Sequence, residues 1–109
     1  MTDGEYRILF MVKARYFDAI VAGTKTFEVR RYSQRWHSMA LKALKGLDDG
    51  IPVTAVFMCG RPRVHRRRIV DVRWVENAEV ALGRAPTQEE LEFLGDGEVI
   101  LFEIGEVVL

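Results

Sequence analysis

The chain has 109 residues, 49% of them apolar and 29% charged, which is the composition of one globular domain with a single core. No apolar run approaches the roughly 20 residues that a membrane-spanning helix needs, and one cysteine excludes an internal disulfide. The first residues, MTDGEYR, are acidic before they are apolar and so do not resemble a signal peptide. We therefore expect a single domain over residues 1–109, in the reducing environment of the cytoplasm and without a membrane partner.

The net charge of zero conceals an uneven distribution. Residues 1–73 contain 15 Lys and Arg against 7 Asp and Glu, a net +8, whereas residues 74–109 contain one arginine against 9 acidic residues, a net −8. This asymmetry indicates either one face that attracts anions or two halves that attract each other within one fold. The charge distribution leaves both interpretations open.

The beginning of the chain predicts a strand and a helix. Residues 6–12 (YRILFMV) form a nearly continuous apolar run of strand-forming residues. A helix over about 15–22 follows, because its apolar residues recur at the spacing of one helical face, as Phe17, Ile20 and Val21 do. Gly23 supplies the left-handed backbone that commonly ends a helix.

A charged strand and a second helix come next. Over residues 26–32, apolar and charged side chains alternate with the period of a half-buried strand. Ser33 is a good N-cap, and apolar residues then recur at helical spacing toward Gly46. The cluster LDDGIP at 47–52 indicates a turn.

The middle of the chain predicts two neighbouring strands. Residues 53–59 (VTAVFMC) form a buried strand that a turn at 60–62 (GRP) ends. A long basic strand over 64–75 follows, with Ile69 and Val70 as core candidates. Three consecutive arginines in this strand cannot all face one side, so we expect a bulge or an irregular start.

The acidic C-terminal third predicts a short helix and a final strand. Thr87 and Glu90 have the spacing of a capping box, and Gly95 would end the helix. Residues 99–109 form the strand, in which Gly105 marks a bulge or a close approach of another segment. The order β-α-β-α-β-β-α-β predicts an α+β fold.

Four residues around the charged strand form a recognisable pattern. Gly23, Lys25, Glu28 and Arg30 match G-x-K-x-x-E-x-R, which resembles the signature of the ASCH domain family. The preceding helix, the chain length and the closing FEIGEVV at 102–108 are also similar to that family. The resemblance implies a small PUA-like mixed β-barrel with short flanking helices and a basic cleft. It implies RNA or a nucleotide as the ligand; the alternative is a small hydrolase, a ribonuclease or an amidohydrolase acting on a modified nucleoside, at the same cleft.

The signature residues are the first candidates for ligand binding. Lys25 can hold a phosphate as a point charge or, when desolvated, act as a base. Glu28 and Arg30 should project to one face of their strand, where the carboxylate could orient a water or read a base edge and the guanidinium could bind phosphate. The two side chains could equally pair with each other. If the protein is an enzyme, we expect Lys25 and Glu28 to be catalytic.

The hydroxyl groups near the signature do not match the amidohydrolase branch. The resemblance implies a threonine nucleophile at the position of Glu28 in that branch, and Thr24 and Thr26 are displaced from it. The supporting acid that the resemblance implies before the last helix has only Glu79 as a rough counterpart. We therefore expect binding of RNA with weak or absent turnover.

Aromatic and basic side chains extend the expected ligand site. Bases of single-stranded RNA stack on exposed rings, and among Tyr16, Tyr32, Trp36 and Trp74 we select Tyr32, which shares the strand face of Arg30. Residues 61–68 (RPRVHRRR) contain five arginines and one histidine, a run that attracts phosphates or forms a solvated loop. We expect a continuous basic surface in which the ligand also contacts Arg66, Arg67 and Arg68. The acidic residues of the short helix should lie outside the cleft, namely Glu89, Glu90 and Glu92.

The remaining reactive residue types indicate no further chemistry. His37 and His65 lack Cys, Asp or Glu partners at metal-ligand spacing, so we expect no metal and no cofactor. Cys59 ends an apolar strand and is expected to be a small buried side chain rather than a nucleophile. The oligomeric state does not follow from the sequence.

Overall fold

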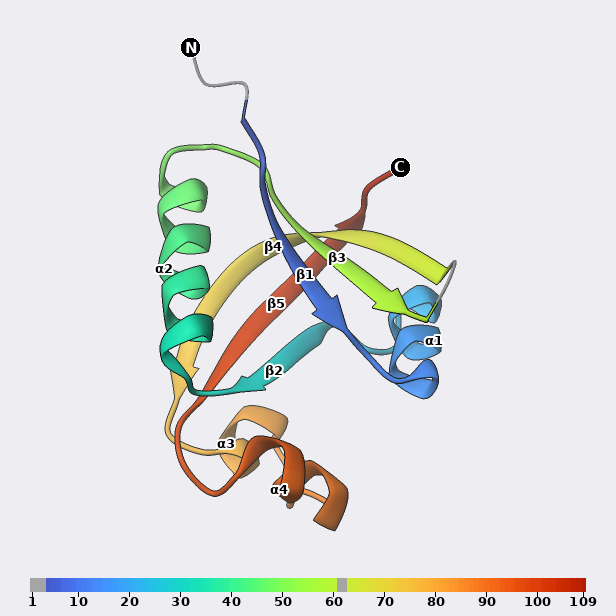
Figure 1. The fold of residues 1–109 in the computed structure, drawn as a ribbon, viewed down its shortest axis with the longest axis vertical. Coiled ribbons are helices and arrows are strands. Elements are labelled where there is room, and N and C mark those ends of the chain that lie inside the picture. The colour runs from blue at the N-terminus through green and yellow to red at the C-terminus, as the bar shows by residue number, and fades with distance from the viewer. Residues whose placement is uncertain (1–3, 61–62) are drawn as a thin grey trace.

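The computed structural model describes residues 4–60 and 63–109 (Figure 1). Its elements are β1 (Tyr6–Met11), α1 (Ala14–Ala22), β2 (Phe27–Arg31), α2 (Gln34–Asp48), β3 (Val53–Cys59), β4 (Arg63–Val75), α3 (Ala78–Leu82), α4 (Gln88–Leu94) and β5 (Val99–Val107). The predicted order is confirmed, except that two helices rather than one lie between β4 and β5. The predicted turn at 60–62 falls partly outside the described residues. No helix within the described ranges is long and apolar enough to cross a membrane.

The strands form one mixed sheet in the order β1-β3-β4-β5-β2. Strands β1 and β3 run parallel, while β3–β4, β4–β5 and β5–β2 are antiparallel pairs. The sheet coils into a half-barrel whose edge strands are β1 and β2 (Figure 1). Helices α1 and α2 pack against the main core, and α3 and α4 lie beside β2 and β5. The α+β class and the barrel-like mixed sheet are thereby confirmed.

Strand β4 contains the irregularity expected at the arginine run. Its pairing with β5 shifts register between Arg67 and Ile69 and again between Ile69 and Asp71. Ile69 is buried, but Val70 is 48% exposed, so the prediction of Val70 as a core residue is wrong. Adjacent strand residues point to opposite faces, and only one of the two can face the core. Opposite this irregularity, a Cβ on Gly105 would lie 2.6 Å from Cγ1 of Val70, which confirms the predicted close approach.

The main core lies between the sheet and helices α1 and α2. Phe10, Phe57 and Phe102 are fully buried on three different strands. The indole of Trp36, on α2, stacks on Phe10 with ring centroids 5.3 Å apart. Ser33 caps α2 as predicted, because its hydroxyl accepts a hydrogen bond from the Trp36 amide.

A second, smaller core cluster attaches α3 and α4 to strands β2 and β5, through Val29, Ala78, Leu94, Val99 and Leu101. Helix α4 has the predicted capping box and ends at Gly95. Helix α3 was not predicted, because five residues are too few to establish a helical period. Its caps were nevertheless in the sequence: Asn77 accepts from the Val80 amide, and Gly83 ends the helix with a φ of 73°.

Candidate functional site

A pocket with a volume of about 130 Å³ lies between β2, the segment that joins β1 to α1, and helix α4. Three of the four signature residues face it, since the charged side chains of Lys25, Glu28 and Arg30 all line its wall. The other lining residues are Met11, Val12, Lys13, Tyr16, Val29, Leu82, Glu89, Glu90, Phe93 and Leu94. The structure thus brings the predicted signature residues together in one concave site.

Glu28 and Arg30 form a buried ion pair in this wall. The period of β2 places both side chains on one face, as predicted, and only 7% of the Glu28 side chain and 10% of the Arg30 side chain are exposed. Both Nε and Nη2 of Arg30 approach Glu28 Oε2, at 2.9 Å and 2.8 Å. Of the two roles left open, pairing with each other is therefore the observed one.

The Arg30 guanidinium is fixed by further contacts. Its Nη2 donates to the carbonyl oxygen of Met11 at 3.0 Å, across the gap between the edge strands β2 and β1. Its Cζ lies 5.2 Å from the ring centroid of Phe10, 5.1 Å from that of Trp36 and 5.5 Å from that of Phe93. Arg30 consequently holds Glu28 in place and is itself held by the core.

Lys25 is the more accessible member of the group. Gly23 ends α1 with a φ of 81°, and the next amides, of Thr24 and Lys25, donate to the Ala19 carbonyl, which fixes the turn that presents Lys25. Its Nζ lies 3.5 Å from Glu28 Oε1 and 5.6 Å from the centroid of the Tyr16 ring. With 21% of its side chain exposed, Lys25 contacts Glu28 and remains partly accessible at the pocket.

Helix α4 forms the opposite wall, which corrects one expectation. Glu89 and Glu90 line the pocket instead of lying outside it, because Leu94 anchors α4 against β2. Glu92 does not line it. The pocket therefore combines three cations with three carboxylates, so its own lining has no excess positive charge.

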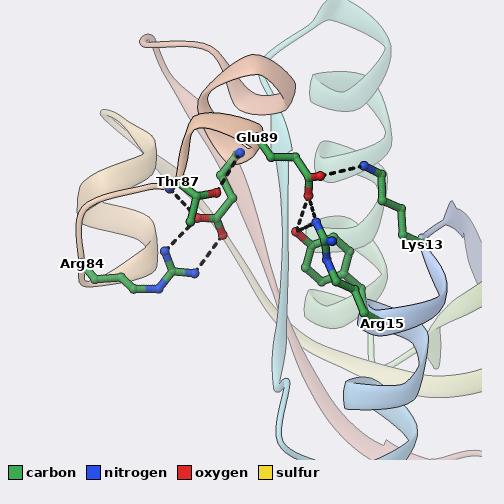
Figure 2. Close-up of polar contacts among 7 residues, drawn as sticks. Lys13, Arg15, Arg84, Thr87 and Glu89 are labelled. Carbon is green, nitrogen blue, oxygen red and sulfur yellow. Dashed lines mark hydrogen bonds and ion pairs between the residues drawn. The ribbon is translucent and has the colours of Figure 1, made fainter.

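The two carboxylates that α4 contributes to the pocket, those of Glu89 and Glu90, have separate partners (Figure 2). Glu90 completes the capping box with Thr87 and accepts two hydrogen bonds of 2.8 Å from the Arg84 guanidinium, which lower the pKa of Glu90 to about 2. Glu89 instead turns toward Lys13, whose Nζ is 3.2 Å away, and toward Arg15.

The other predicted ligand-binding residues lie elsewhere. Tyr32 lines a neighbouring hollow that shares Arg30 and Phe93 with the pocket. Arg66, Arg67 and Arg68 on β4 do not line the pocket. Arg66 is exposed, whereas Arg67 donates to the Gly105 and Ile20 carbonyls and Arg68 donates to Thr54 and Glu5.

No threonine or histidine is among the described residues that line the pocket. Thr24 and Thr26 do not line it, and Glu79 is an exposed residue of α3. Within the described ranges, no group of three or more His, Cys, Asp and Glu side chains could hold a metal ion. Cys59 is partly buried.

Sequence reasoning missed two aromatic contributors, Tyr16 and Phe93. Tyr16 is one of the four aromatic candidates in the sequence, and it lies in the first turn of α1, beside the pocket. Phe93 is 56% exposed although it precedes the buried Leu94. The only sequence signal for it is a large aromatic residue next to the core position of a short helix.

The comparisons with known proteins identify the fold. No protein-family model and no curated protein sequence matches the chain. Three solved structures of the ASCH protein from Zymomonas mobilis, the parent form and two point variants, superpose with TM-scores of 0.61 to 0.62. They cover 92% of this chain and 67–69% of the other, at 14–15% sequence identity. The chain therefore has the fold of an ASCH domain, as the signature pattern indicated.

Proposed function

We propose that this protein binds single-stranded RNA or a nucleotide and that one base enters the pocket beside Lys25 and Glu28. The observation that supports this most directly is the shared location of Lys25, Glu28 and Arg30 in one concave wall. ASCH domains resemble PUA RNA-binding domains in fold, which agrees with the proposal.

The hydrogen-bonding capacity of this wall suits a base edge. Arg30 occupies Glu28 Oε2, so Oε1 keeps acceptor capacity, and the Lys25 ammonium beside it has donors to spare. An acceptor and a donor 3.5 Å apart complement the adjacent donor and acceptor that the Watson–Crick edge of each base presents. This arrangement recognises a base without specifying which one.

The size and walls of the pocket suit the same ligand. A volume of about 130 Å³ is smaller than the roughly 300–1,000 Å³ of pockets that enclose drug-sized ligands, so only part of a larger molecule would be enclosed. Apolar side chains and the rings of Tyr16 and Phe93 provide surfaces on which a base can pack or stack. The balanced charge of the lining favours a neutral base there over a bare phosphate.

The test compares RNA with an oligomer of equal length and charge that lacks bases. Short single-stranded RNAs of each base, and the abasic oligomer, are titrated with the protein and followed by fluorescence anisotropy. We expect RNA to bind more tightly, and Lys25→Met to lose about tenfold or more in affinity, because a hydrogen bond from a charged group contributes about 1.5–3 kcal/mol. Lys25→Arg should retain much of the affinity, since arginine keeps the charge and the donors.

Lys45→Met is the matched control, because Lys45 is an exposed lysine on α2 that pairs with Asp49, away from the lining of the pocket. Equal binding of RNA and the abasic oligomer, or full affinity in Lys25→Met, would contradict the proposal.

The hydrolase alternative is tested with the same proteins. Wild type, Lys25→Arg and Lys25→Met are incubated with single-stranded RNA and with acylated cytidine, and products are measured. Arginine stays protonated and cannot act as a base, so turnover by wild type that both variants lack would assign a proton transfer to Lys25. We expect little or no product, because no serine or threonine hydroxyl is among the described residues that line the pocket.

A further inference from the structure

A group of side chains at the rim of the pocket converges on the carboxylate of Glu89. Lys13 Nζ lies 3.2 Å from Glu89 Oε2, Arg15 forms an ion pair with Oε1, and the Tyr16 hydroxyl donates to Oε1 at 3.3 Å. Arg15 also donates to the Tyr16 oxygen and lies over its ring. Figure 2 shows Glu89 reaching from α4 to these side chains at the start of α1. One carboxylate thus has three donors, two of them cationic.

The charges in this group do not balance. Glu89 is the acidic partner of both Lys13 and Arg15 among the described residues, so one positive charge remains uncompensated. The side chains are also accessible, with exposures of 63% for Lys13, 60% for Arg15 and 44% for Glu89. Ion pairs this exposed contribute little to stability, so a stronger anion can replace the carboxylate at low cost.

The fold of α4 does not depend on Glu89. The helix is capped by Thr87 and Glu90, with Arg84 completing that network, and Leu94 anchors it in the core. Glu89 takes no part in these contacts (Figure 2). Its carboxylate can therefore leave Lys13 and Arg15 without loss of the helix.

We propose that Lys13, Arg15 and Tyr16 form a phosphate subsite and that Glu89 occupies it in the unliganded protein as an internal competitor. This inference rests on the proposed function, because Lys13, Tyr16 and Glu89 line the same pocket as Lys25 and Glu28. A ligand whose base lies against Lys25 would place a phosphate at this rim. A phosphate monoester has a charge of about −1.5 to −2 at pH 7 and three acceptor oxygens, so it satisfies two cations and a hydroxyl better than one carboxylate does.

The test uses pairs of ligands that differ only in the phosphate. Dissociation constants of the four nucleosides and of their 5′- and 3′-monophosphates are measured by calorimetry at fixed ionic strength. We expect monophosphates to bind wild type more tightly than nucleosides. Glu89→Gln should tighten monophosphate binding by about threefold to fivefold, the scale of one surface ion pair, and should change nucleoside binding by less than that. Glu92→Gln, an exposed substitution on the same helix, is the control.

The cations are tested with the double variant Lys13→Gln, Arg15→Gln, in which the preference for the monophosphate should disappear. An unchanged preference in this variant, or an unchanged monophosphate affinity in Glu89→Gln, would overturn the subsite. If nucleosides and monophosphates bind equally and depend on Lys25, the base pocket stands and the phosphate subsite fails. If neither binds to wild type, both proposals fail.

Discussion

Replacement of Arg30 by methionine measures how far the pocket wall and the fold depend on each other. Methionine keeps an unbranched apolar side chain but removes every donor. Glu28 Oε2 then loses its contacts at 2.9 Å and 2.8 Å, and the Met11 carbonyl loses one at 3.0 Å. The carboxylate would remain in a site where only 7% of its side chain is exposed, with Lys25 Nζ, 3.5 Å from Oε1, as its remaining cationic partner.

The size of the effect follows from this burial. Removal of one partner from a buried ion pair typically costs about 3–5 kcal/mol, whereas replacement of the whole pair by apolar residues is often close to neutral. Against a total stability of roughly 5–15 kcal/mol, Arg30→Met should therefore be strongly destabilised. The double variant Glu28→Met, Arg30→Met should recover more than half of the loss.

The assay is urea unfolding at pH 7, followed by circular dichroism, for wild type, the single variant and the double variant. Arg66→Met serves as the control, because Arg66 is an exposed arginine in a strand of the same sheet. If Arg30→Met lowers the free energy of unfolding by less than about 1 kcal/mol, the pair contributes no more than a surface ion pair does, and the reasoning is refuted. A double variant less stable than the single one would do the same.

Two further predictions concern α4 and the irregularity in β4. Arg84 lowers the folded pKa of Glu90 to about 2, below its ordinary 4.5, so this contact stabilises the protein above pH 4.5 and is lost as the pH falls toward 2. The free energy of unfolding, measured from pH 7 to pH 2, should be lower in Arg84→Met than in wild type, and this difference should shrink as the pH falls from 4.5 to 2. A difference that stays constant over this range would exclude the linkage. Gly105→Ala should lose about 1–3 kcal/mol of unfolding free energy by overpacking against Val70, as measured by urea unfolding. The loss should be smaller in a Val70→Ala background, and an equal loss in both backgrounds would contradict this cause.

Local patterns were sufficient to predict the strand that forms the pocket wall. The period of β2 placed Glu28 and Arg30 on one face, and Gly23 located the turn that presents Lys25. These are relations between residues that are close in sequence, where backbone geometry fixes direction. The buried pairing of Glu28 with Arg30 remained one of two alternatives, because burial depends on Phe10, Trp36 and Phe93 from other elements.

Relations between distant segments could not be predicted in the same way. The uneven charge suggested that acidic residues avoid the ligand site, yet Glu89 lies at the pocket because α4 packs on β2 through Leu94. The arginine run suggested a ligand surface, yet Arg67 binds backbone carbonyls and Arg68 binds Glu5 and Thr54. The distribution of charge along a sequence does not determine which ion-pair and hydrogen-bond partners the charged side chains acquire on folding.

The hydrogen bond from Arg30 to the Met11 carbonyl has a consequence for how this domain can acquire new ligands. It ties together the two edge strands of the sheet, and the same guanidinium holds Glu28 at the base of the pocket. If the proposed ligand binds against Glu28, a mutation of either residue acts on folding and on recognition together, and selection cannot adjust one without the other. Glu89 is 44% exposed and pairs with Lys13 and Arg15 rather than with Arg30 or Glu28, so we expect specificity among related chains to diverge at that position first.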